Sequence, residues 1–398
     1  MGHRPFALFW WSRVLTIGAY HMQAVAIGWL VYDLTGSAFD LGLVGLIQLV
    51  PVVVLTLLIG HLADRYDRRL IIRASQLVNA LAAALLTVGS INGWLTREFL
   101  FAAVFVVGTA RAFETPTWLT LLPSLVPPPM IPRAVAGSAT ANQCAIIGGP
   151  ALGGLIYAAG PSVVFAVCCA AFVIGLMLLS LVRAAPTKQD RQPLTLTSLF
   201  AGVGFIRSRR LLLGVITLDM FAVLLGGATA LLPIYAKDIL GTGPIGLGLL
   251  RSAPAVGALV ASIVLARYPI NHSLGRVMFA AVVLFGISTT LFAISTSFPL
   301  SLLVLVVLGA SDAVSVVIRF ALVQVETPDA MLGRVSAING LFTGTSNTLG
   351  DFRAGLTAAW FGAVPSVLIG GIGTILVALI WMRLFPELRD IKRFKTGP

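Results

Sequence analysis

Charge is scarce in this sequence. Only 11% of its 398 residues are Asp, Glu, Lys or Arg, and 58% are hydrophobic. Soluble proteins usually carry about 25% charged residues. A soluble core could not bury this much apolar surface, so the composition predicts a protein that is largely surrounded by lipid.

Signatures of enzymes and cofactor sites are also missing. The three cysteines, Cys144, Cys168 and Cys169, lie in apolar stretches and lack the spacing of a disulfide framework or a zinc site. The sequence contains no Walker A motif, no HExxH and no pattern typical of a nucleophile with its base. It therefore predicts no cofactor, no metal, no use of ATP and no enzymatic activity.

Long apolar runs, in contrast, recur along the whole chain. Each is about 20 residues long, which is the length of helix that spans a bilayer, and none shows the alternation of a membrane barrel. The sequence therefore predicts an all-α membrane protein. We expect twelve transmembrane helices, at approximately 7–33, 40–63, 70–91, 98–122, 133–158, 162–183, 211–236, 245–266, 275–296, 298–324, 334–361 and 363–384.

The net charge of +12 reflects orientation rather than nucleic-acid binding. With the N-terminus in the cytoplasm, Arg97 and Lys237 are the only ones of the 27 Lys and Arg residues that fall in predicted outer loops. Basic residues concentrate in cytoplasmic loops of membrane proteins. The distribution therefore predicts that both termini are cytoplasmic.

A polar segment at 185–210 divides the chain near its midpoint. We expect an N-terminal six-helix bundle over 1–184, a cytoplasmic central loop over 185–210 with a short helix near 196–206, and a C-terminal six-helix bundle with a cytoplasmic tail over 211–398. The two halves match weakly at an offset of 201 residues, which pairs Gly149 with Gly350 and Gly154 with Gly355. Repeated halves are typical of transporters.

The stretch GHLADRYDRR, at 60–69, breaks the charge-poor pattern at the cytoplasmic end of the second predicted helix. It resembles the loop signature of the major facilitator superfamily, Gly-x-Leu-Ala-Asp-Arg-x-Gly-Arg-Arg/Lys. The residues that match include Gly60, Asp64, Arg65, Arg68 and Arg69, with Leu62 and Ala63 between them. Asp67 replaces the glycine of the signature, as in the branch of bacterial siderophore and drug exporters.

This resemblance implies the major facilitator fold, in which two pseudo-symmetric six-helix bundles move by alternating access. It also implies a cytoplasmic gate, in which Asp64 faces the N-terminal end of the eleventh predicted helix, at 334–361, where the helix dipole favours an anion. Arg65, Arg68 and Arg69 would join the same gate. The alternative is that these charges set the topology alone.

A second motif, GGPALGG at 148–154, lies in the fifth predicted helix. It resembles the antiporter motif of the superfamily, whose core Gly-Pro-x-x-Gly-Gly is matched by Gly149, Pro150, Gly153 and Gly154. The resemblance implies export. The alternative is that these small residues only let two helices pack closely.

Ionisable residues inside predicted spans are functional candidates because a charge in the bilayer is costly. Arg111 and Glu114 share a helix face and could pair locally. Asp312 and Arg319 are about 10 Å apart along a helix axis, so we expect no direct bond between them. The others are Arg13, Asp219, Arg251, Asp351 and Arg353, and we expect Asp351 and Arg353 to find partners other than each other.

Asp219 is our first candidate for a proton carrier. It has no basic neighbour within a helical turn, and apolar surroundings disfavour the charged form of an acid. Asp312 and Glu114 are the next candidates. The alternative for Asp219 is a carboxylate held permanently by an arginine of another helix. His21 and Gln143 are candidates for contact with substrate, although either could instead be a packing residue.

Together these features predict a secondary active exporter of a small organic solute, siderophore-like or drug-like, that works by proton-coupled antiport. We expect a monomer in the bacterial inner membrane, whose partners are the solute, protons and the lipid bilayer. One alternative is a lipid or lysolipid flippase of the same superfamily. The other is a non-transporting membrane sensor, which would normally carry an additional soluble domain. Arginines in a cavity favour anionic solutes and acids favour cationic ones. Both are present, so the sequence does not identify the solute.

Overall fold

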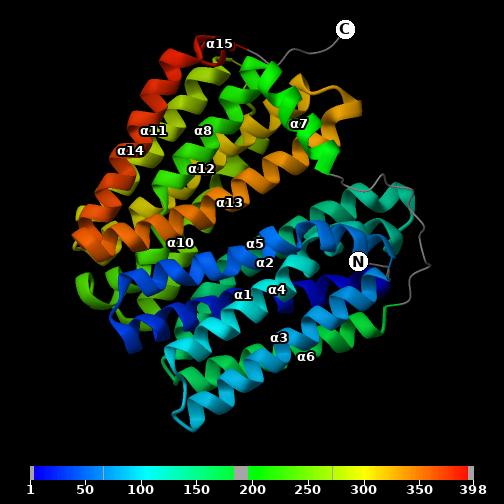
Figure 1. Cartoon of the computed structure of the whole chain (residues 1–398), viewed down its shortest axis with the longest axis vertical. Helices are drawn as coiled ribbons and strands as arrows, with labels where there is room; N and C mark the ends of the chain where they lie inside the picture. Colours follow the sequence, from blue (N-terminus) through cyan, green and yellow to red (C-terminus); the bar gives the residue numbers. More distant parts are fainter. Residues whose placement is uncertain (1–3, 66, 183–195, 271, 393–398) are drawn as a thin grey trace. The chain divides into compact units, whose positions relative to one another are not determined.

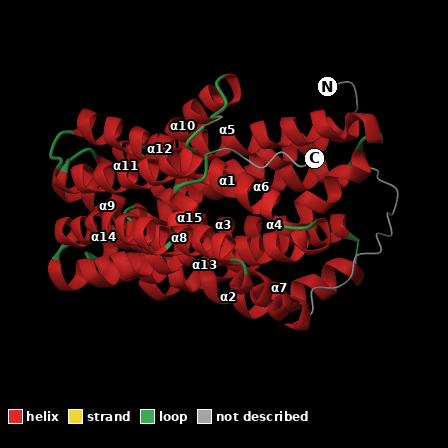
Figure 2. Cartoon of the chain, turned by 90° about the horizontal axis from the view of Figure 1, so that it is seen from above, coloured by secondary structure: helices red, strands yellow, loops and turns green. Residues whose placement is uncertain are grey.

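Helices make up the secondary structure of the computed structural model (Figure 2). The structure describes residues 4–65, 67–182, 196–270 and 272–392, except for the side chains of 56–65, 119–120, 128, 196–200 and 329–330. Within these ranges no β-strand occurs. The predicted all-α class is therefore confirmed.

The long helices begin and end close to the predicted apolar runs, and the short helix α7 matches the one expected near 196–206. Helices α1 to α6 are Arg4–Thr35, Ala38–Arg65, Arg68–Ile91, Arg97–Leu121, Ile131–Tyr157 and Pro161–Ser180. Helices α7 to α11 are Leu196–Ser208, Arg210–Gly226, Leu232–Ile234, Gly243–Arg267 and Leu274–Ile294. Helices α12 to α15 are Phe298–Glu326, Asp329–Phe361, Ala363–Leu384 and Pro386–Arg389.

In the described part of the chain, 10 helical stretches are long and apolar enough to cross a membrane. Helices α5 and α13 are not among them, although they contain 27 and 33 residues and a span needs about 20. Both are rich in Gly, Ser, Thr and Asn, which lowers their hydropathy. The count of twelve spans therefore stays a prediction.

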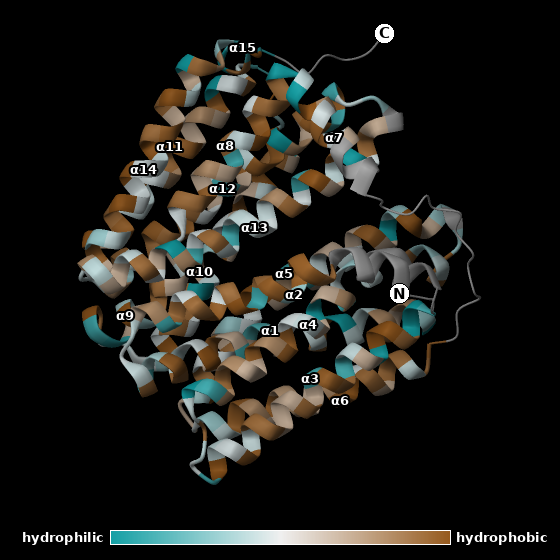
Figure 3. Ribbon diagram, viewed as in Figure 1, coloured by the Kyte–Doolittle hydropathy of each residue, from teal (hydrophilic) through white to brown (hydrophobic). Residues whose placement is uncertain are grey.

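Helix α3 shows how the bundle is arranged for a lipid solvent. Gln76 and Asn79 are buried, whereas Leu77, Leu81 and Leu85 are exposed. In water this arrangement would be unfavourable, but in lipid the apolar side chains belong outside and the polar ones inside. Figure 3 shows that hydrophobic residues predominate along α11 and α14 as well.

Two compact units divide the chain. The first comprises Met1–Gly36, Ile47–Leu194 and Thr242–Ser252, and the second comprises Ser37–Leu46, Thr195–Gly241 and Ala253–Pro398. Helices α2 and α10 contribute residues to both units. The bundle boundaries expected from the sequence, 1–184 and 211–398, are therefore still predictions.

The helices pair in the same way in each unit (Figure 1). In the first unit α1 packs on α5 and α6, and α3 packs on α4 and α6. In the second unit α8 packs on α13 and α14, and α11 packs on α12 and α14. The pairs correspond one to one, which explains why the two halves of the sequence match.

Close backbone contacts account for the repeated glycines. A Cβ atom on Gly149 of α5 would lie 3.0 Å from the carbonyl oxygen of Gly18 on α1. A Cβ atom on Gly350 of α13 would lie 2.8 Å from the carbonyl oxygen of Val223 on α8. Neither helix crossing has room for a side chain. Gly149 and Gly350, which are 201 residues apart, therefore lie at equivalent helix crossings in the two units.

Candidate functional site

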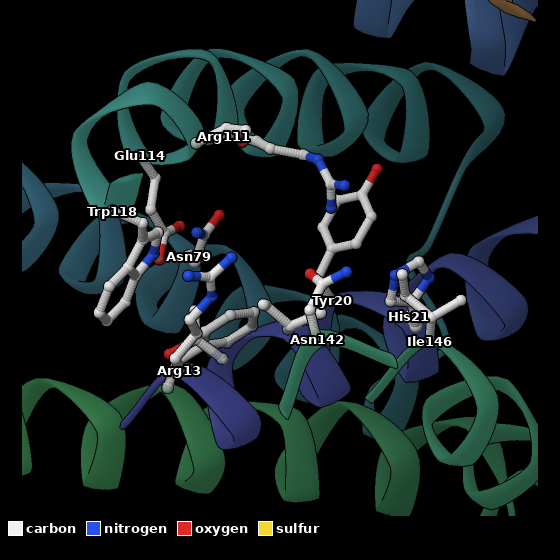
Figure 4. Close-up of a pocket in the computed structure, with 13 residues that line it drawn as sticks. Arg13, Tyr20, His21, Asn79, Arg111, Glu114, Trp118, Asn142 and Ile146 are labelled. Atoms are coloured by element: carbon white, nitrogen blue, oxygen red, sulfur yellow. Dashed lines mark hydrogen bonds between the residues drawn. The ribbon is translucent and has the colours of Figure 1, made fainter. Parts of the chain in front are cut away.

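A polar cavity of about 200 Å³ lies inside the first unit (Figure 4). Side chains from α1, α3, α4, α5 and α6 line it. On α1 the lining residues Arg13, Ile17 and Tyr20 recur every three or four positions, which places them on one face of the helix. Arg111 and Glu114 follow the same spacing on α4.

Arg111 lies over the aromatic ring of Tyr20, with its Cζ atom 3.6 Å from the ring centroid (Figure 4). The face of an aromatic ring is electron-rich and attracts a cation, more strongly when water is excluded. The Tyr20 hydroxyl in turn donates a hydrogen bond to Oε1 of Gln48, 3.2 Å away on α2. These contacts fix the position of Arg111 without neutralising its charge.

Glu114 is bonded to Trp118 rather than to Arg111. The indole Nε1 of Trp118 donates to Oε1 of Glu114 over 2.9 Å, one helical turn away on α4. Among the described residues, no ion pair joins Glu114 to Arg111, so the local pair that their spacing allowed does not form. Arg13 donates from Nη1 to Oγ of Ser138 on α5, 2.5 Å away.

Of the two predicted substrate contacts, His21 lines this cavity and Gln143 does not. The neighbouring Asn142 lines it instead. Sequence reasoning missed Tyr20 and Asn79, which also line it. Their signal was present, since polar residues in an apolar span that share a face with an arginine belong to the same candidate site.

The second unit holds a network of two acids and one arginine. Asp219 on α8 forms an ion pair with Arg319 on α12 through Oδ1. Its other carboxylate oxygen accepts a hydrogen bond from Thr343 on α13 over 2.8 Å. Only 13% of the Asp219 side chain and 7% of the Arg319 side chain are exposed. The alternative interpretation of Asp219 requires an arginine on another helix, and Arg319 is such a residue.

Asp312 also lies near this arginine. Nη2 of Arg319 is 3.7 Å from Oδ1 of Asp312, which corrects our expectation that these two residues cannot pair. The expectation considered only the rise between their Cα atoms. Helical side chains point toward the N-terminus of their helix, so the long Arg319 side chain reaches back to Asp312. The Asp312 side chain is 47% exposed.

Helix α8 breaks inside the predicted span. The predicted span at 211–236 falls within one candidate membrane span, Arg210–Ile239. The helix inside it is interrupted, because α8 ends at Gly226 and a 3-10 turn follows at Thr229–Leu231. Gly227 lies in the break, where a Cβ atom would come within 2.6 Å of the carbonyl carbon of Gly350. The close approach of α13 therefore requires glycine at this point.

Two charged residues of α13 bond the broken ends. Arg353 donates from Nε to the carbonyl of Leu224 over 3.0 Å and from Nη2 to that of Leu225 over 2.6 Å. Asp351 accepts a hydrogen bond from the Thr229 hydroxyl over 2.9 Å. The last carbonyls of a helix lack partners within the helix, and a cation satisfies them well. In these bonds Asp351 and Arg353 use different partners.

The glycines of the GGPALGG motif are the points where other helices approach α5. A Cβ atom on Gly153 would lie 2.7 Å from the Cα atom of Met22 on α1. A Cβ atom on Gly154 would lie 2.9 Å from the Cα atom of Gly248 on α10. The packing role left open by the sequence is therefore real, and a role in antiport stays a prediction.

The GHLADRYDRR signature at 60–69 is described only in part. Gly60, Asp64 and Arg65 belong to α2, but the side chains of Asp64 and Arg65 lie outside the described residues, so the predicted gate contacts of Asp64 cannot be compared. Asp67 is the N-cap of α3, and its Oδ1 accepts a hydrogen bond from the backbone N–H of Arg69 over 2.9 Å. Asp67, which stands in place of the glycine of the signature, therefore caps the N-terminal end of α3.

Arg69 also uses its side chain within the first unit. Its Nη2 lies 2.9 Å from Oδ2 of Asp67, and this bond holds the pKa of Asp67 below its ordinary value. Its Nη1 donates to the carbonyl of Val182 over 3.3 Å, and Arg73 donates to the carbonyl of Ser180 over 3.2 Å. The two arginines therefore supply partners for the C-terminal end of α6. Arg68 is the first residue of α3.

In the part of the chain that the structure describes, no three His, Cys, Asp or Glu side chains gather where they could hold a metal ion.

The chain is similar in sequence to bacterial exporters. A family model described as "Transmembrane secretion effector" matches residues 1–395. The chain is 28% identical over 409 residues to the enterobactin exporter EntS of Citrobacter koseri, which covers 100% of this chain and 94% of that protein. It is 23% identical over 398 residues to macrolide efflux protein A of Streptococcus pyogenes, which covers 98% of this chain and 96% of that protein.

Solved transporter structures have the same fold. A bacterial homologue of the human lysosomal transporter Spinster superposes with a TM-score of 0.77 at 12% identity, covering 99% of this chain and 98% of that one. The nucleoside transporter NupG superposes with a TM-score of 0.74 at 14% identity, covering 97% of this chain and 99% of that one. At such low identity the likeness shows the fold alone.

Proposed function

We propose that this chain, which belongs to the transmembrane secretion effector family of the major facilitator superfamily, moves a small organic solute out of the cell. The observation that carries the proposal is the cavity of about 200 Å³, which membrane-length helices line with Arg13, Arg111 and Glu114. Each charge at the centre of a span costs about 2.5 to 3.5 kcal/mol on insertion scales. Such a cost is expected where a solute must be bound inside the membrane.

Export rather than uptake is supported by the relatives in sequence, which are an enterobactin exporter and a macrolide efflux protein. The antiporter motif at Gly149, Pro150, Gly153 and Gly154 agrees with this direction. The bacterial relatives also support a multi-pass protein of the inner membrane. We place both termini in the cytoplasm from the distribution of Lys and Arg.

Coupling to protons needs an acid that can exchange protons with water. Of the predicted candidates, Asp219 has both carboxylate oxygens bonded, to Arg319 and Thr343, and Glu114 is only 6% exposed. Asp312 is 47% exposed and shares Arg319 with Asp219. A small cavity of about 10 Å³ borders Asp312 and Arg319, which is enough for about one water molecule. Asp312 therefore replaces Asp219 as the first candidate for the proton carrier.

Alternating access would expose the cavity to each side of the membrane in turn. In that cycle the cytoplasmic residues Asp64, Arg65, Arg68 and Arg69 would hold and release the inner gate. The chain would act as a monomer, with the solute and protons as its partners.

The function is tested with purified protein in proteoliposomes under an imposed pH gradient. Siderophores, cationic drugs and lysolipids are supplied in turn, and their movement is measured with and without the gradient. We expect gradient-dependent movement of a small organic solute. Movement of lysolipid alone would instead indicate a flippase, and no movement of any compound would indicate a protein that does not transport.

A further inference from the structure

We propose that the exported solute is an aromatic organic anion, and that Arg111 and Arg13 bind its acidic group in the cavity of the first unit. This inference rests on the proposed function, because it names the solute of the same cavity. Three features support it: an excess of positive charge, unused hydrogen-bond donors on both arginines, and aromatic walls.

Positive charge exceeds negative charge among the side chains that line the cavity. Arg13 and Arg111 are its cations, and Glu114 is the one acid among the described lining residues. Glu114 is already bonded to the indole of Trp118. Among the residues that the structure describes, no carboxylate lies within 4.0 Å of either guanidinium. Because charges interact strongly where water is scarce, the cavity favours an anion.

The donors of Arg111 are available to a solute. Its guanidinium is held over the ring of Tyr20, and no described residue accepts a hydrogen bond from it. Its nitrogen atoms are also not among the buried polar atoms without a partner, so they keep access to the cavity. A guanidinium presents parallel N–H groups that match the two oxygens of a carboxylate. Arg111 is therefore preorganised for an acidic group.

Arg13 is only partly satisfied by the protein. Its Nη1 donates to Ser138, but its Nε is buried and has no acceptor. A buried donor without an acceptor is unfavourable, particularly on a charged group. An anion in the cavity would remove this cost by supplying an acceptor or by drawing the side chain toward it.

The remaining walls suit an aromatic body. Trp118 and Phe172 line the cavity on α4 and α6. Its volume of about 200 Å³ exceeds that of an engineered cavity of about 150 Å³ that holds benzene. One or two aromatic rings therefore fit, with the acid directed toward the arginines.

The test uses three probes that share the 2-naphthyl ring and carry a small group of different charge: 2-naphthoate, its neutral amide 2-naphthamide, and the cation 2-naphthylmethylammonium. Their affinities for the purified full-length protein in nanodiscs are measured by titration calorimetry without a gradient. A charge-assisted hydrogen bond corresponds to about 10- to 100-fold in affinity. We expect 2-naphthoate to bind tighter than 2-naphthamide by that factor.

Two variants of α4 locate the effect. Arg111→Met should remove the preference for 2-naphthoate while the neutral amide binds as before, which shows that the cavity is intact. The control is Arg97→Met, because Arg97 lies on the same helix with its Cζ atom 5.2 Å from the Phe101 ring centroid, outside the cavity. It should leave all three affinities unchanged.

The proposal is overturned if the cation binds tighter than the anion, as a site centred on the exposed Asp312 would favour. It is also overturned if 2-naphthoate fails to bind, or if Arg111→Met keeps the preference. Failure of the proposed export function can be distinguished from failure of this inference about the solute. Anion binding that depends on Arg111 but without gradient-driven movement would refute the proposed function alone, and gradient-driven export of a cationic drug without anion binding would refute this inference alone.

Discussion

Asp219 and Arg319 form an ion pair between α8 and α12, although 100 residues separate them in the sequence. Because Arg319 also lies 3.7 Å from Asp312, a single positive charge serves two carboxylates. The two acids are not equivalent, since the side chain of Asp219 is 13% exposed and that of Asp312 is 47% exposed. Arg319 therefore contacts one largely buried acid and one more accessible acid.

Asp312→Asn should abolish gradient-driven accumulation of the solute and leave passive exchange intact, because the amide cannot carry a proton. Asp219→Asn should instead destabilise the protein by about 3 kcal/mol, because it removes the tight partner of a buried arginine. Proton flux in proteoliposomes and thermal unfolding are measured for both variants, with the exposed Asp390→Asn as the control. Full accumulation by Asp312→Asn would remove Asp312 as the carrier.

Arg353→Met should loosen the break after α8, because it keeps the volume of the side chain but loses the bonds to the carbonyls of Leu224 and Leu225. Hydrogen bonds to charged groups contribute about 1.5 to 3 kcal/mol each. Hydrogen exchange of a peptide covering 222–232 should become faster. The control is Arg210→Met, which removes a similar bond to the carbonyl of Leu384 at an exposed helix end. Equal exchange in all three proteins would contradict this role.

Gly154→Ala should destabilise the protein by about 1 to 3 kcal/mol through overpacking, because the new methyl group would meet the backbone of α10. Gly148→Ala, six residues earlier on the same helix, meets nothing within 4 Å and should be neutral or slightly stabilising. Thermal unfolding of the two variants decides the matter. A Gly154→Ala protein as stable as the parent would show that the crossing tolerates a side chain.

Asp67→Ala should lower the stability of the protein by about 1 kcal/mol at neutral pH, because it removes the N-cap of α3. The bond from Arg69 holds the pKa of Asp67 below its ordinary value. The ionised carboxylate therefore stabilises the fold fully above an unfolded pKa of about 3.9, and the effect is lost as the pH falls through the folded pKa. Unfolding measured from pH 7 down to pH 3 should show the two proteins converging. A constant difference would contradict the role of the charge.

Single cysteines introduced at 97, 160, 240 and 297, in a background without Cys144, Cys168 and Cys169, should react with an impermeant reagent from outside the cell. Cysteines at 67, 190, 272 and 392 should not react. The reason is the cytoplasmic concentration of basic loops. The reverse pattern would invert the orientation and remove the gate role proposed for Asp64.

Most of the fold was predictable because lipid imposes simple rules on length and polarity. The predicted run at 363–384 coincides with α14, and the run at 70–91 differs from α3 by two residues at one end. Membership of the major facilitator superfamily was predictable from the signature at 60–69 and is confirmed. The break in α8 was not predictable from hydropathy, because Gly227 is required by its contact with Gly350, more than a hundred residues away.

The site was predictable where its residues share one helix and not where helices meet. Arg111 and Glu114 were recognised from their spacing on α4, but Tyr20 and Trp118, which actually contact them, were not. The pairing of Arg319 with Asp312 was missed because helix rise alone ignores the reach of an arginine side chain. Partners on separate helices depend on packing, which a single sequence does not contain.

The helix-end bonds made by arginines also bear on how the protein is synthesised. Arg69 and Arg73 bond carbonyls at the end of α6, so both donors and acceptors lie within the first 182 residues. Domains generally fold as units during translation, the N-terminal one first. These bonds at the end of α6 can therefore form while the ribosome is still translating the rest. Arg210, in contrast, bonds the carbonyl of Leu384, 174 residues later. This bond can form only after Leu384 has been translated, when the chain is almost complete.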